Sequence, residues 1–320
     1  MIDNKYSLGI DIGGTNTVFG LIDSSGHIIK KDSILTNSNN PPRSLFENIF
    51  NTIKKWEIEL DNSDIVRDIG VGVPNGNYFT GMVVRPPNMG KDWDELNLCS
   101  LIKTFKNVPV TITNDANAAA LGEKYYGVAK SMNDVVVITL GSGLGSGIIV
   151  NNNMVYGHDG FAGELGHLII DPEGRECRCG RRGCLEMYVS AKGLNYTARE
   201  YRQEYPDNKF LQSIDVQNVD GKLFDDAFDD GEKIVIDIYK YTGHMLGIGL
   251  AQIATILSPE AFVFYGGLSN AKHRILDSAK DSMNDSLLSF QKNKIKILLS
   301  ELPDGEAGIL GASCLNTLRN

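Results

Sequence analysis

The sequence predicts an α/β protein of two domains with a cleft between them. The chain has 320 residues, which is more than one hydrophobic core usually supports. A strand, a glycine turn and a second strand occur at 6–23, and the same pattern returns about 130 residues later at 135–152. Two α/β domains built from the same unit explain this repeat, and ligands commonly bind in the cleft between such domains.

The apolar pattern gives the order of the expected elements. Apolar runs between turn residues predict strands, and a helical face between Leu45 and Trp56 follows the turn at Pro41-Pro42. The first domain is expected at 1–114 and the second at 115–320, with the last helix packing back on the first domain. The expected strands are 5–12, 17–23, 27–35, 69–74, 109–113, 135–141, 146–152, 261–267 and 295–300, and helices are expected over most of 188–257 and over 307–318.

Composition excludes several classes of protein. Hydrophobic residues at 42% and charged residues at 22% are ordinary for a globular protein. A net charge of -9 argues against nucleic acid as the main partner, because phosphate backbones attract basic surfaces. No apolar run approaches the roughly 20 residues that a membrane-spanning helix needs, and the first residues do not resemble a secretion signal. Three of the five cysteines crowd into 177–184, which fits a reducing compartment, so a cytoplasmic protein is expected.

Three glycine turns have the composition needed to hold phosphate. The first glycine turn is Asp11–Thr17, the second is Leu140–Gly147, and the third is Gly266-Gly267. Glycine has no Cβ, so backbone N–H groups can approach an anion together, and Asp11 is placed to meet Mg²⁺ or its waters. Each turn alone is also compatible with a simple hairpin turn. The expected nucleotide-binding residues are Asp11, Gly13, Gly14, Thr15, Asn16, Gly141, Gly143, Gly145, Gly266 and Gly267.

The cysteine cluster has the spacing of a metal site. His167 precedes Cys177, Cys179 and Cys184, and three thiolates with one imidazole complete a tetrahedral zinc site. No ligand position is left for water, so the zinc is expected to be structural. Free cysteines in a loop are the alternative.

Three carboxylates are candidates for contact with a hydroxyl substrate. Asp115 follows a strand and opens an alanine-rich helix, so it is either a helix cap or a group placed for chemistry at the carboxyl end of the strand. Glu164 and Glu186 flank the cysteine cluster. Their alternative role is that of solvated surface carboxylates.

Taken together, these segments resemble the ROK family (repressors, open reading frames, kinases). The resemblance rests on Asp11-Ile-Gly-Gly-Thr, Asn114-Asp115, Glu164-Leu-Gly-His167 and Cys177-x-Cys-Gly-x-x-Gly-Cys-Leu-Glu186, and it runs from residue 7 to about 314. The segments Pro74–Gly81, with Pro87-Asn88, and Gly183–Tyr188 look like the glucokinase branch. Many kinases of the family have Lys where this chain has Asn16.

The resemblance implies an actin/hexokinase-like fold and phosphoryl transfer from ATP to a hexose, with glucose to glucose 6-phosphate as the first expectation. It implies Asp115 as the base, Mg²⁺ with ATP, a structural zinc and a homodimer. N-acetylglucosamine, N-acetylmannosamine and allose remain alternative substrates. The implied sugar contacts are Asn88, Asn114, Glu164, His167 and Glu186, and His167 is also an implied zinc ligand.

Two other functions fit the sequence less well than a kinase. A sugar-sensing regulator of the same family needs a DNA-reading helix-turn-helix, for which the roughly ten residues before Asp11 are too few. An actin-like or chaperone-like ATPase leaves the two glutamates and the zinc loop unexplained.

Overall fold

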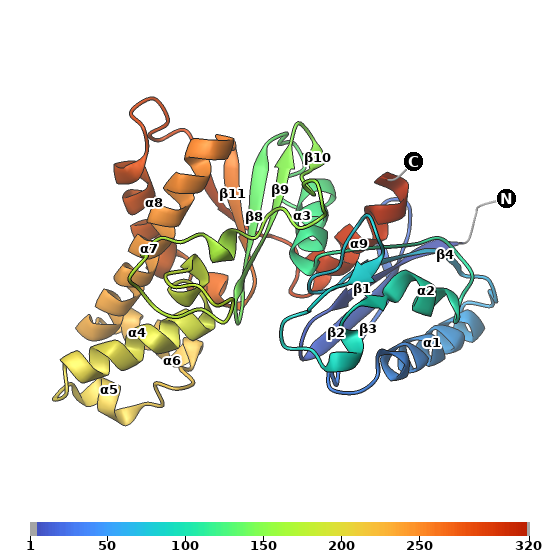
Figure 1. The fold of residues 1–320 in the computed structure, drawn as a ribbon, viewed down its shortest axis with the longest axis horizontal. Helices are drawn as coiled ribbons and strands as arrows, with labels where there is room; N and C mark the ends of the chain where they lie inside the picture. Colours follow the sequence, from blue (N-terminus) through green and yellow to red (C-terminus); the bar gives the residue numbers. More distant parts are fainter. Residues whose placement is uncertain (1–4, 319–320) are drawn as a thin grey trace. The chain divides into compact units, whose positions relative to one another are not determined.

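The computed structural model describes residues 5–318 and is coloured along the chain in Figure 1. This part of the chain forms two compact units. The first unit contains 5–132, 147–163 and 301–318, and the second contains 133–146 and 164–300. Within the described residues, none of the helices combines the length and the apolar character needed to cross a membrane.

The first unit is built on a five-stranded sheet in the order β3-β2-β1-β4-β7. β1 pairs antiparallel with β2 and parallel with β4, and β4 pairs parallel with β7. The sheet therefore begins as a meander and continues as the parallel half of an α/β layer. Its strands are β1 (Tyr6–Ile12), β2 (Asn16–Ile22), β3 (Ile28–Leu35), β4 (Val66–Gly72) and β7 (Val110–Thr113).

Helices cover both faces of this sheet. On one face, α1 (Pro42–Glu59) and α2 (Leu98–Lys103) close an apolar core with alternate residues of the strands, such as Leu8 and Ile10. On the other face lie α3 (Asp115–Tyr125) and α9 (Glu306–Leu318). Between these elements the chain makes η1 (Lys91–Trp93) and a short antiparallel pair, β5 (Met82–Val83) with β6 (Leu96–Asn97).

α9 lies on the first sheet at a distance that only glycine allows. A Cβ at Gly70 would lie 1.8 Å from the carbonyl oxygen of Ala312, and a Cβ at Gly9 would lie 2.0 Å from that of Ile309. Because real Cβ atoms never approach so closely, these two glycines fix how near α9 comes to β1 and β4.

The second sheet has the order β10-β9-β8-β11-β12, and β8, β11 and β12 are parallel. The boundary between the units falls inside β9, after Ser146. The strands are β8 (Val135–Leu140), β9 (Leu144–Val150), β10 (Asn153–Met154), β11 (Ala261–Tyr265) and β12 (Lys296–Leu299).

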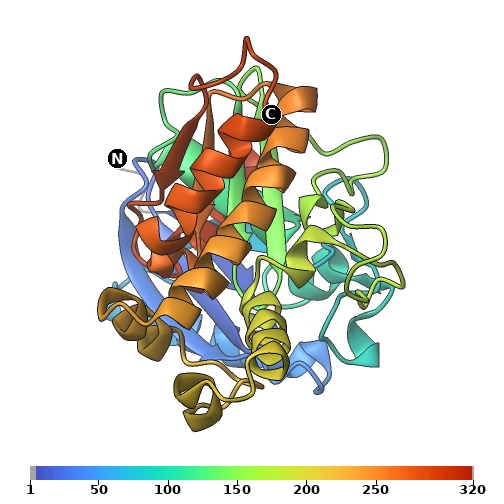
Figure 2. The ribbon, with the colours of Figure 1, turned by 90° about the vertical axis from the view of Figure 1, so that its left-hand side faces the viewer.

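The helices of the second unit are dominated by one long pair. α7 (Lys233–Leu257) and α8 (His273–Ser286) run side by side (Figure 2), and a Cβ at Gly247 would lie 2.5 Å from the carbonyl oxygen of Ala279. The remaining helices are η2 (Leu165–His167), η3 (Leu185–Met187), α4 (Ala191–Glu204), α5 (Lys209–Ser213), α6 (Gly221–Asp229) and η4 (Gly267–Ala271).

The order of strands and helices agrees with the sequence-based expectation, whereas the boundary at residue 114 does not coincide with that of the compact units. α3 packs on α9 through small residues, because a Cβ at Gly122 would lie 2.1 Å from the Ala307 carbonyl oxygen and one at Gly311 would lie 1.7 Å from that of Ala118. This contact includes α3 in the first unit, which extends to residue 132.

We expect Gly70→Ala to destabilise the protein by about 3 kcal/mol, the upper end of what overpacking costs, because α9 must move away from the sheet. Urea unfolding of the two proteins measures the difference. The matched control is Gly221→Ala, where a Cβ meets nothing within 4 Å, so the free energy of unfolding should change by no more than about 1 kcal/mol. Equal stabilities of the wild type and Gly70→Ala would contradict the role of this glycine.

Candidate active site

The first glycine turn joins β1 to β2 in the first unit. The Gly13 N–H donates to the Asn16 carbonyl oxygen at 3.0 Å, and the Thr36 hydroxyl donates to the Gly13 carbonyl oxygen at 2.7 Å. Gly14, Thr15 and Asn16 are exposed. The turn is therefore fixed by its own hydrogen bonds and presents its tip to solvent.

The carboxyl groups of Asp11 and Asp115 interact at the ends of β1 and β7. Burial, with a smaller contribution from the nearby Asp115, raises the pKa of Asp11 to about 7. Two glycines make room for this pair. A Cβ at Gly308 would lie 2.3 Å from Asp11 Oδ2, and a Cβ at Gly72 would lie 3.5 Å from Asp11 Oδ1 and 3.3 Å from the Cα of Asp115. The first unit thus holds two acidic groups in one place, an arrangement suited to a cation.

The helix α3 is capped by Asn114. The Asn114 Oδ1 accepts a hydrogen bond from the Ala116 N–H at 2.9 Å, and Asp115 Oδ1 lies at the same distance from that N–H. Asp115 is the first residue of the helix and is only partly buried. Since Asn114 holds the N-cap position, capping alone does not account for the carboxylate at 115.

Asn88 lies next to the first glycine turn. Its Cβ would be 3.9 Å from a Cβ at Gly14, and its carbonyl oxygen accepts a hydrogen bond from Ser38 Oγ at 3.2 Å. Asn88 is exposed and has a φ of 61°. The irregular segment that contains Asn88 is therefore brought against the turn.

Sequence reasoning did not single out Asn77, which fixes the same irregular segment. Asn77 is buried, with 3% of its surface exposed. Asn77 Oδ1 accepts from the N–H groups of Phe79 and Thr80 at 3.0 Å each, and Asn77 Nδ2 donates to the Asp159 carbonyl oxygen at 2.6 Å. The only signal in the sequence was the asparagine-rich turn Pro74–Gly81.

Tyr156 is a second residue of the site region that sequence reasoning did not single out. Its ring stacks on Tyr78 with centroids 4.1 Å apart, and its hydroxyl group bonds to Thr113, the residue before Asn114. Tyr156 thus connects the irregular segment to the end of β7.

The second and third glycine turns lie side by side in the second unit. They follow β8 and β11, which pair in parallel up to Thr139 and Tyr265. Gly266 has a φ of 101°, and a Cβ there would lie 2.7 Å from the Leu140 carbonyl oxygen. The helix that follows directly is the short η4, and α8 begins only at His273. Two glycine turns at neighbouring carboxyl ends of a parallel sheet form a place where such folds bind ligands.

The four residues expected to bind zinc are gathered in the second unit. One ligand atom from each of His167, Cys177, Cys179 and Cys184 lies within 4.8 Å of the others. His167 Nδ1 is 3.7 Å from the sulfur of Cys177, and the sulfurs of Cys179 and Cys184 are 3.6 Å apart. Gly183 makes this tight loop possible, since its φ is 71° and a Cβ would lie 1.6 Å from the Asp171 carbonyl oxygen. Three sulfurs and one imidazole nitrogen are the donor set of a closed zinc site.

One sulfur of this cluster ionises readily. Partial burial opposes ionisation of Cys179, but hydrogen bonds from Arg181 and the neighbouring thiols outweigh it and lower the pKa of Cys179 to about 6. The Arg181 Nε lies 3.5 Å from the sulfur. Because the thiolate is the form that binds metal, this favours a metal at neutral pH.

Glu186 lies between the cluster and the second glycine turn. Its Oε1 is 3.1 Å from the sulfur of Cys177 and 3.5 Å from His167 Nδ1, and its Oε2 would be 3.0 Å from a Cβ at Gly143. The carboxylate of Glu186 therefore lies near both the expected zinc ligands and the second glycine turn.

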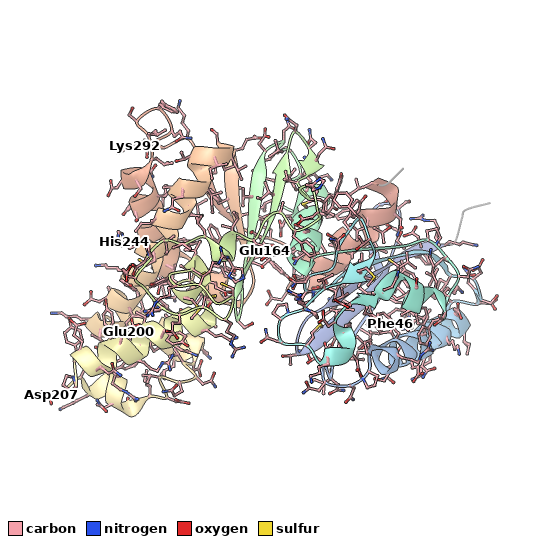
Figure 3. The ribbon with its side chains drawn as sticks, viewed as in Figure 1. Phe46, Glu164, Glu200, Asp207, His244 and Lys292 are labelled. Atoms are coloured by element: carbon pink, nitrogen blue, oxygen red, sulfur yellow. The ribbon has the colours of Figure 1, made fainter. Side chains whose placement is uncertain are left out.

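Glu164, labelled in Figure 3, stands at the start of η2. The next residue, Leu165, donates its N–H to Ser146 Oγ at 3.3 Å, and a Cβ at Gly166 would lie 2.2 Å from the Leu144 carbonyl oxygen, so η2 lies directly on β9. The pKa of Glu164 is raised, mainly by desolvation and to a smaller extent by repulsion from Glu186. The charge of His167 acts in the opposite direction. Glu164, His167 and Glu186 thus form one electrostatic group.

The expected site residues are divided between the two units. The first unit contains the first glycine turn with Asp11, Asn88, Asn114 and Asp115, and the second contains the other two glycine turns, Glu164, Glu186 and the cluster. Asp115, expected in the second domain, belongs to the first unit. Each unit brings together residues that are far apart in the chain.

Comparison with known proteins assigns this arrangement to a family. The ROK family profile matches residues 7–318. The chain belongs to the ROK family. The expectation from the sequence is confirmed, and the mixed α/β fold is that of ROK sugar kinases.

The relatives of this ROK chain include enzymes and regulators. A glucokinase from Streptomyces coelicolor is 31% identical over 97% of this chain and 96% of its own length. A crystal structure of a ROK family glucokinase from Streptomyces griseus, in complex with glucose and AMPPNP, is 31% identical with a TM-score of 0.79 and covers 97% of this chain and 98% of the other. The xylose repressor of Bacillus subtilis is 30% identical over 97% of this chain but only 76% of its own length.

Proposed function

We propose that the protein is an ATP-dependent hexokinase that converts glucose to glucose 6-phosphate. The observation that carries the proposal is the Asp115 carboxylate at the carboxyl end of β7, beside Asp11 of the first glycine turn. A base for a hydroxyl group and a phosphate-holding turn are the two groups that phosphoryl transfer to a sugar requires. The glucokinase relatives support glucose as the substrate.

In this proposal Asp115 accepts the proton of the C6 hydroxyl as its oxygen attacks the γ-phosphorus of ATP. The backbone N–H groups of the glycine turns bind phosphate oxygens and hold the phosphoryl group in line with the hydroxyl. Little covalent work falls to the protein, so the rate depends on positioning and on the electrostatics of these groups.

Asp11 fits the magnesium that accompanies ATP. Its raised pKa reflects burial and repulsion from Asp115, and a divalent cation would offset both. Magnesium bound there neutralises charge on the phosphate oxygens. Asp11 would hold the ion directly or through a water molecule.

The proposed sugar contacts are amide, carboxylate and imidazole groups. Asn114 and Asn88 offer amide groups, and Glu164 and Glu186 offer carboxylates that accept hydrogen bonds from sugar hydroxyls. Nδ1 of His167 faces Cys177 and Glu186, which leaves Nε2 for a hydroxyl.

The proposed metal of the cluster is a structural zinc held by His167, Cys177, Cys179 and Cys184. The donor set and its spacing support zinc. Since the protein would fill all four positions, such an ion would orient the loop and would not activate water. A homodimer, implied by the family resemblance, belongs to the same proposal.

The match to a xylose repressor favours a second candidate, a sugar-responsive regulator. A regulator of this kind would bind sugar without phosphorylating it, so an assay of ATP-dependent phosphorylation distinguishes the two candidates.

We expect the purified protein to phosphorylate glucose with ATP and Mg²⁺ in a coupled assay. The panel should include N-acetylglucosamine, N-acetylmannosamine and allose, and Asp115→Asn serves as the blank. Sugar binding without ATP consumption for any member of the panel would contradict the kinase and favour the regulator.

We expect Asp115→Asn to reduce kcat by about 10²–10⁴, the usual contribution of a positioned base, with little change in glucose binding by calorimetry. Asp32→Asn, at an exposed position of β3, is the matched control. Near-normal turnover of Asp115→Asn would exclude Asp115 as the base.

We expect Cys179→Ser to lower the zinc content and to raise KM for glucose about 10–100-fold, while KM for ATP changes little. The reason is that loss of the ion releases the loop that carries His167 and Glu186. Cys99→Ser in the first unit is the control, because Cys99 bonds to the Val110 carbonyl oxygen away from the cluster. Absence of zinc from the wild type, or normal sugar binding by the zinc-free variant, would refute the coupling.

A further inference from the structure

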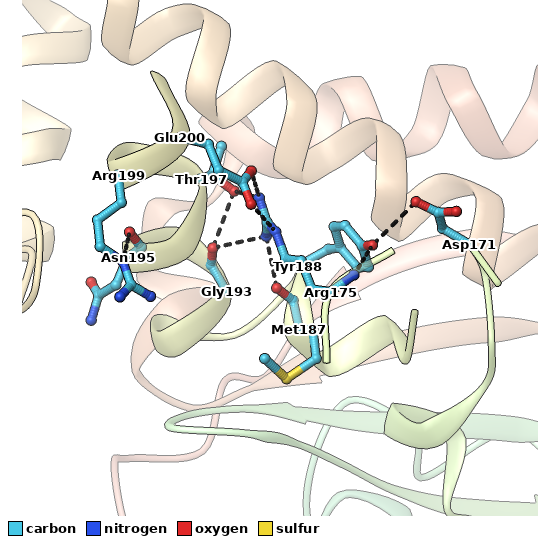
Figure 4. Close-up of polar contacts among 9 residues, drawn as sticks. All are labelled: Asp171, Arg175, Met187, Tyr188, Gly193, Asn195, Thr197, Arg199 and Glu200. Atoms are coloured by element: carbon cyan, nitrogen blue, oxygen red, sulfur yellow. Dashed lines mark hydrogen bonds and ion pairs between the residues drawn. The ribbon is translucent and has the colours of Figure 1, made fainter. Parts of the chain in front are cut away.

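Arg175 lies two residues before the first cysteine of the cluster, and its side chain is buried, which is unusual for arginine. Only 8% of its side-chain surface is exposed. All five N–H groups of its guanidinium have an acceptor, and Figure 4 shows these contacts. A surface charge does not need such a set of partners, so the side chain has a structural task.

The acceptors belong to two neighbouring elements. Nη1 donates to the carbonyl oxygens of Met187 in η3 at 2.7 Å and of Gly193 in α4 at 3.2 Å. Nη2 donates to Thr197 Oγ1 at 2.9 Å and to Glu200, and Nε donates to Glu200 Oε1 at 2.9 Å. Gly193, Thr197 and Glu200 follow one face of α4 at helical spacing. One guanidinium therefore fastens η3 to two turns of α4.

Tyr188 also contacts Arg175, through both its ring and its hydroxyl group. The Arg175 guanidinium lies 4.6 Å from the centre of the Tyr188 ring, a cation–π distance. The Tyr188 hydroxyl accepts from the Arg175 backbone N–H at 3.0 Å and donates to Asp171 Oδ2 at 3.3 Å. The Arg175 carbonyl oxygen accepts from the Gly183 N–H at 2.8 Å. Arg175 is thus bonded to residues on both sides of the segment 184–186.

We infer that Arg175 is a positioning residue that fixes η3 and thereby aims Glu186. The inference rests on the proposed function, in which Glu186 contacts the sugar. η3 has only three residues, and the hydrogen bonds that the N–H groups of Met187, Tyr188 and Val189 make back to Cys184 and Leu185 do not by themselves define its direction. The Leu185 N–H donates to the Leu168 carbonyl oxygen, and the Ser190 hydroxyl donates to the Glu186 carbonyl oxygen. The bond from Arg175 to the carbonyl oxygen of Met187, the residue after Glu186, adds the constraint that ties η3 to α4. Displacement of a substrate-orienting group by about 1 Å can cost 10²-fold in rate.

Lysine cannot replace Arg175 in this role. Its ammonium group has three donors on a single nitrogen and no planar fork, so it cannot serve all the acceptors that the guanidinium reaches in η3 and α4. In Arg175→Lys at least one of the hydrogen bonds to the carbonyl oxygens of Met187 and Gly193 would be lost. The segment should then shift or loosen although the positive charge remains.

The first test measures the segment itself and does not depend on catalysis. We expect hydrogen–deuterium exchange of Arg175→Lys to be at least about tenfold faster at the amides of Met187, Tyr188 and Val189, which bond within η3. Arg182→Lys is the matched control in the same loop, since its side chain is 56% exposed. Unchanged exchange in Arg175→Lys, or equal exchange in both variants, overturns the inference.

The second test measures KM for glucose and for ATP together with the zinc content. We expect Arg175→Lys to raise KM for glucose about tenfold, with KM for ATP and zinc content unchanged. A merely structural arginine would lower the active fraction and the melting temperature but would leave both KM values as they are. Thr197→Val, which removes one acceptor, should give a smaller change in the same direction, and it keeps the test open if Arg175→Lys folds poorly.

A double-mutant cycle separates failure of the inference from failure of the proposed function. If Arg175 acts through Glu186, then Arg175→Lys combined with Glu186→Gln should have the same KM for glucose as Glu186→Gln alone. Additive effects, or a raised KM in Glu186→Gln but not in Arg175→Lys, overturn the inference. A normal KM in Glu186→Gln instead refutes the proposed sugar contact, while the exchange experiment still decides whether Arg175 holds η3.

Discussion

The first unit depends on backbone packing that only glycine permits. α9 lies on β1 and β4 over Gly9 and Gly70, and α3 lies on α9 through Gly122 and Gly311. Because backbone atoms are in direct contact, these elements cannot move closer together, and the positions of their ends relative to one another are fixed. Asp11 and Asp115 stand at two of those ends. The packing that closes the core therefore also sets the spacing of the acidic pair.

In the second unit the same result is reached with polar groups. Here a long irregular loop has few apolar residues to bury, and its shape is set by hydrogen bonds from Arg175 and Tyr188 and by the cluster of three sulfurs and one imidazole. Such contacts are directional, so they can place Glu186 without a surrounding helix or strand. They also fail more abruptly than apolar packing when a single partner is lost.

Much of the fold was predictable from sequence because local patterns of apolar and turn residues determine the strands and helices. Apolar runs between turn residues predicted the strands, and the glycine turns and the cysteine spacing predicted the candidate site. The boundary at residue 114 was less predictable, since the alanine-rich helix α3 has no local feature that tells which unit it joins. Its partner, α9, lies about 180 residues further along the chain. Arg175 and Asn77 were missed for a related reason, because a buried and a solvated polar residue look alike until their acceptors are known.

The position of α9 has a consequence for the order in which the protein is made. A ribosome adds roughly 5–20 residues per second, so about 10–40 s pass between the synthesis of α3 and that of α9. During that interval the part of the sheet at Gly9 and Gly70 has been made, but α9, which packs on it, has not. The whole second unit, by contrast, ends at residue 300 and leaves the ribosome before α9 does. The unit that is translated first is therefore the unit that completes its core last.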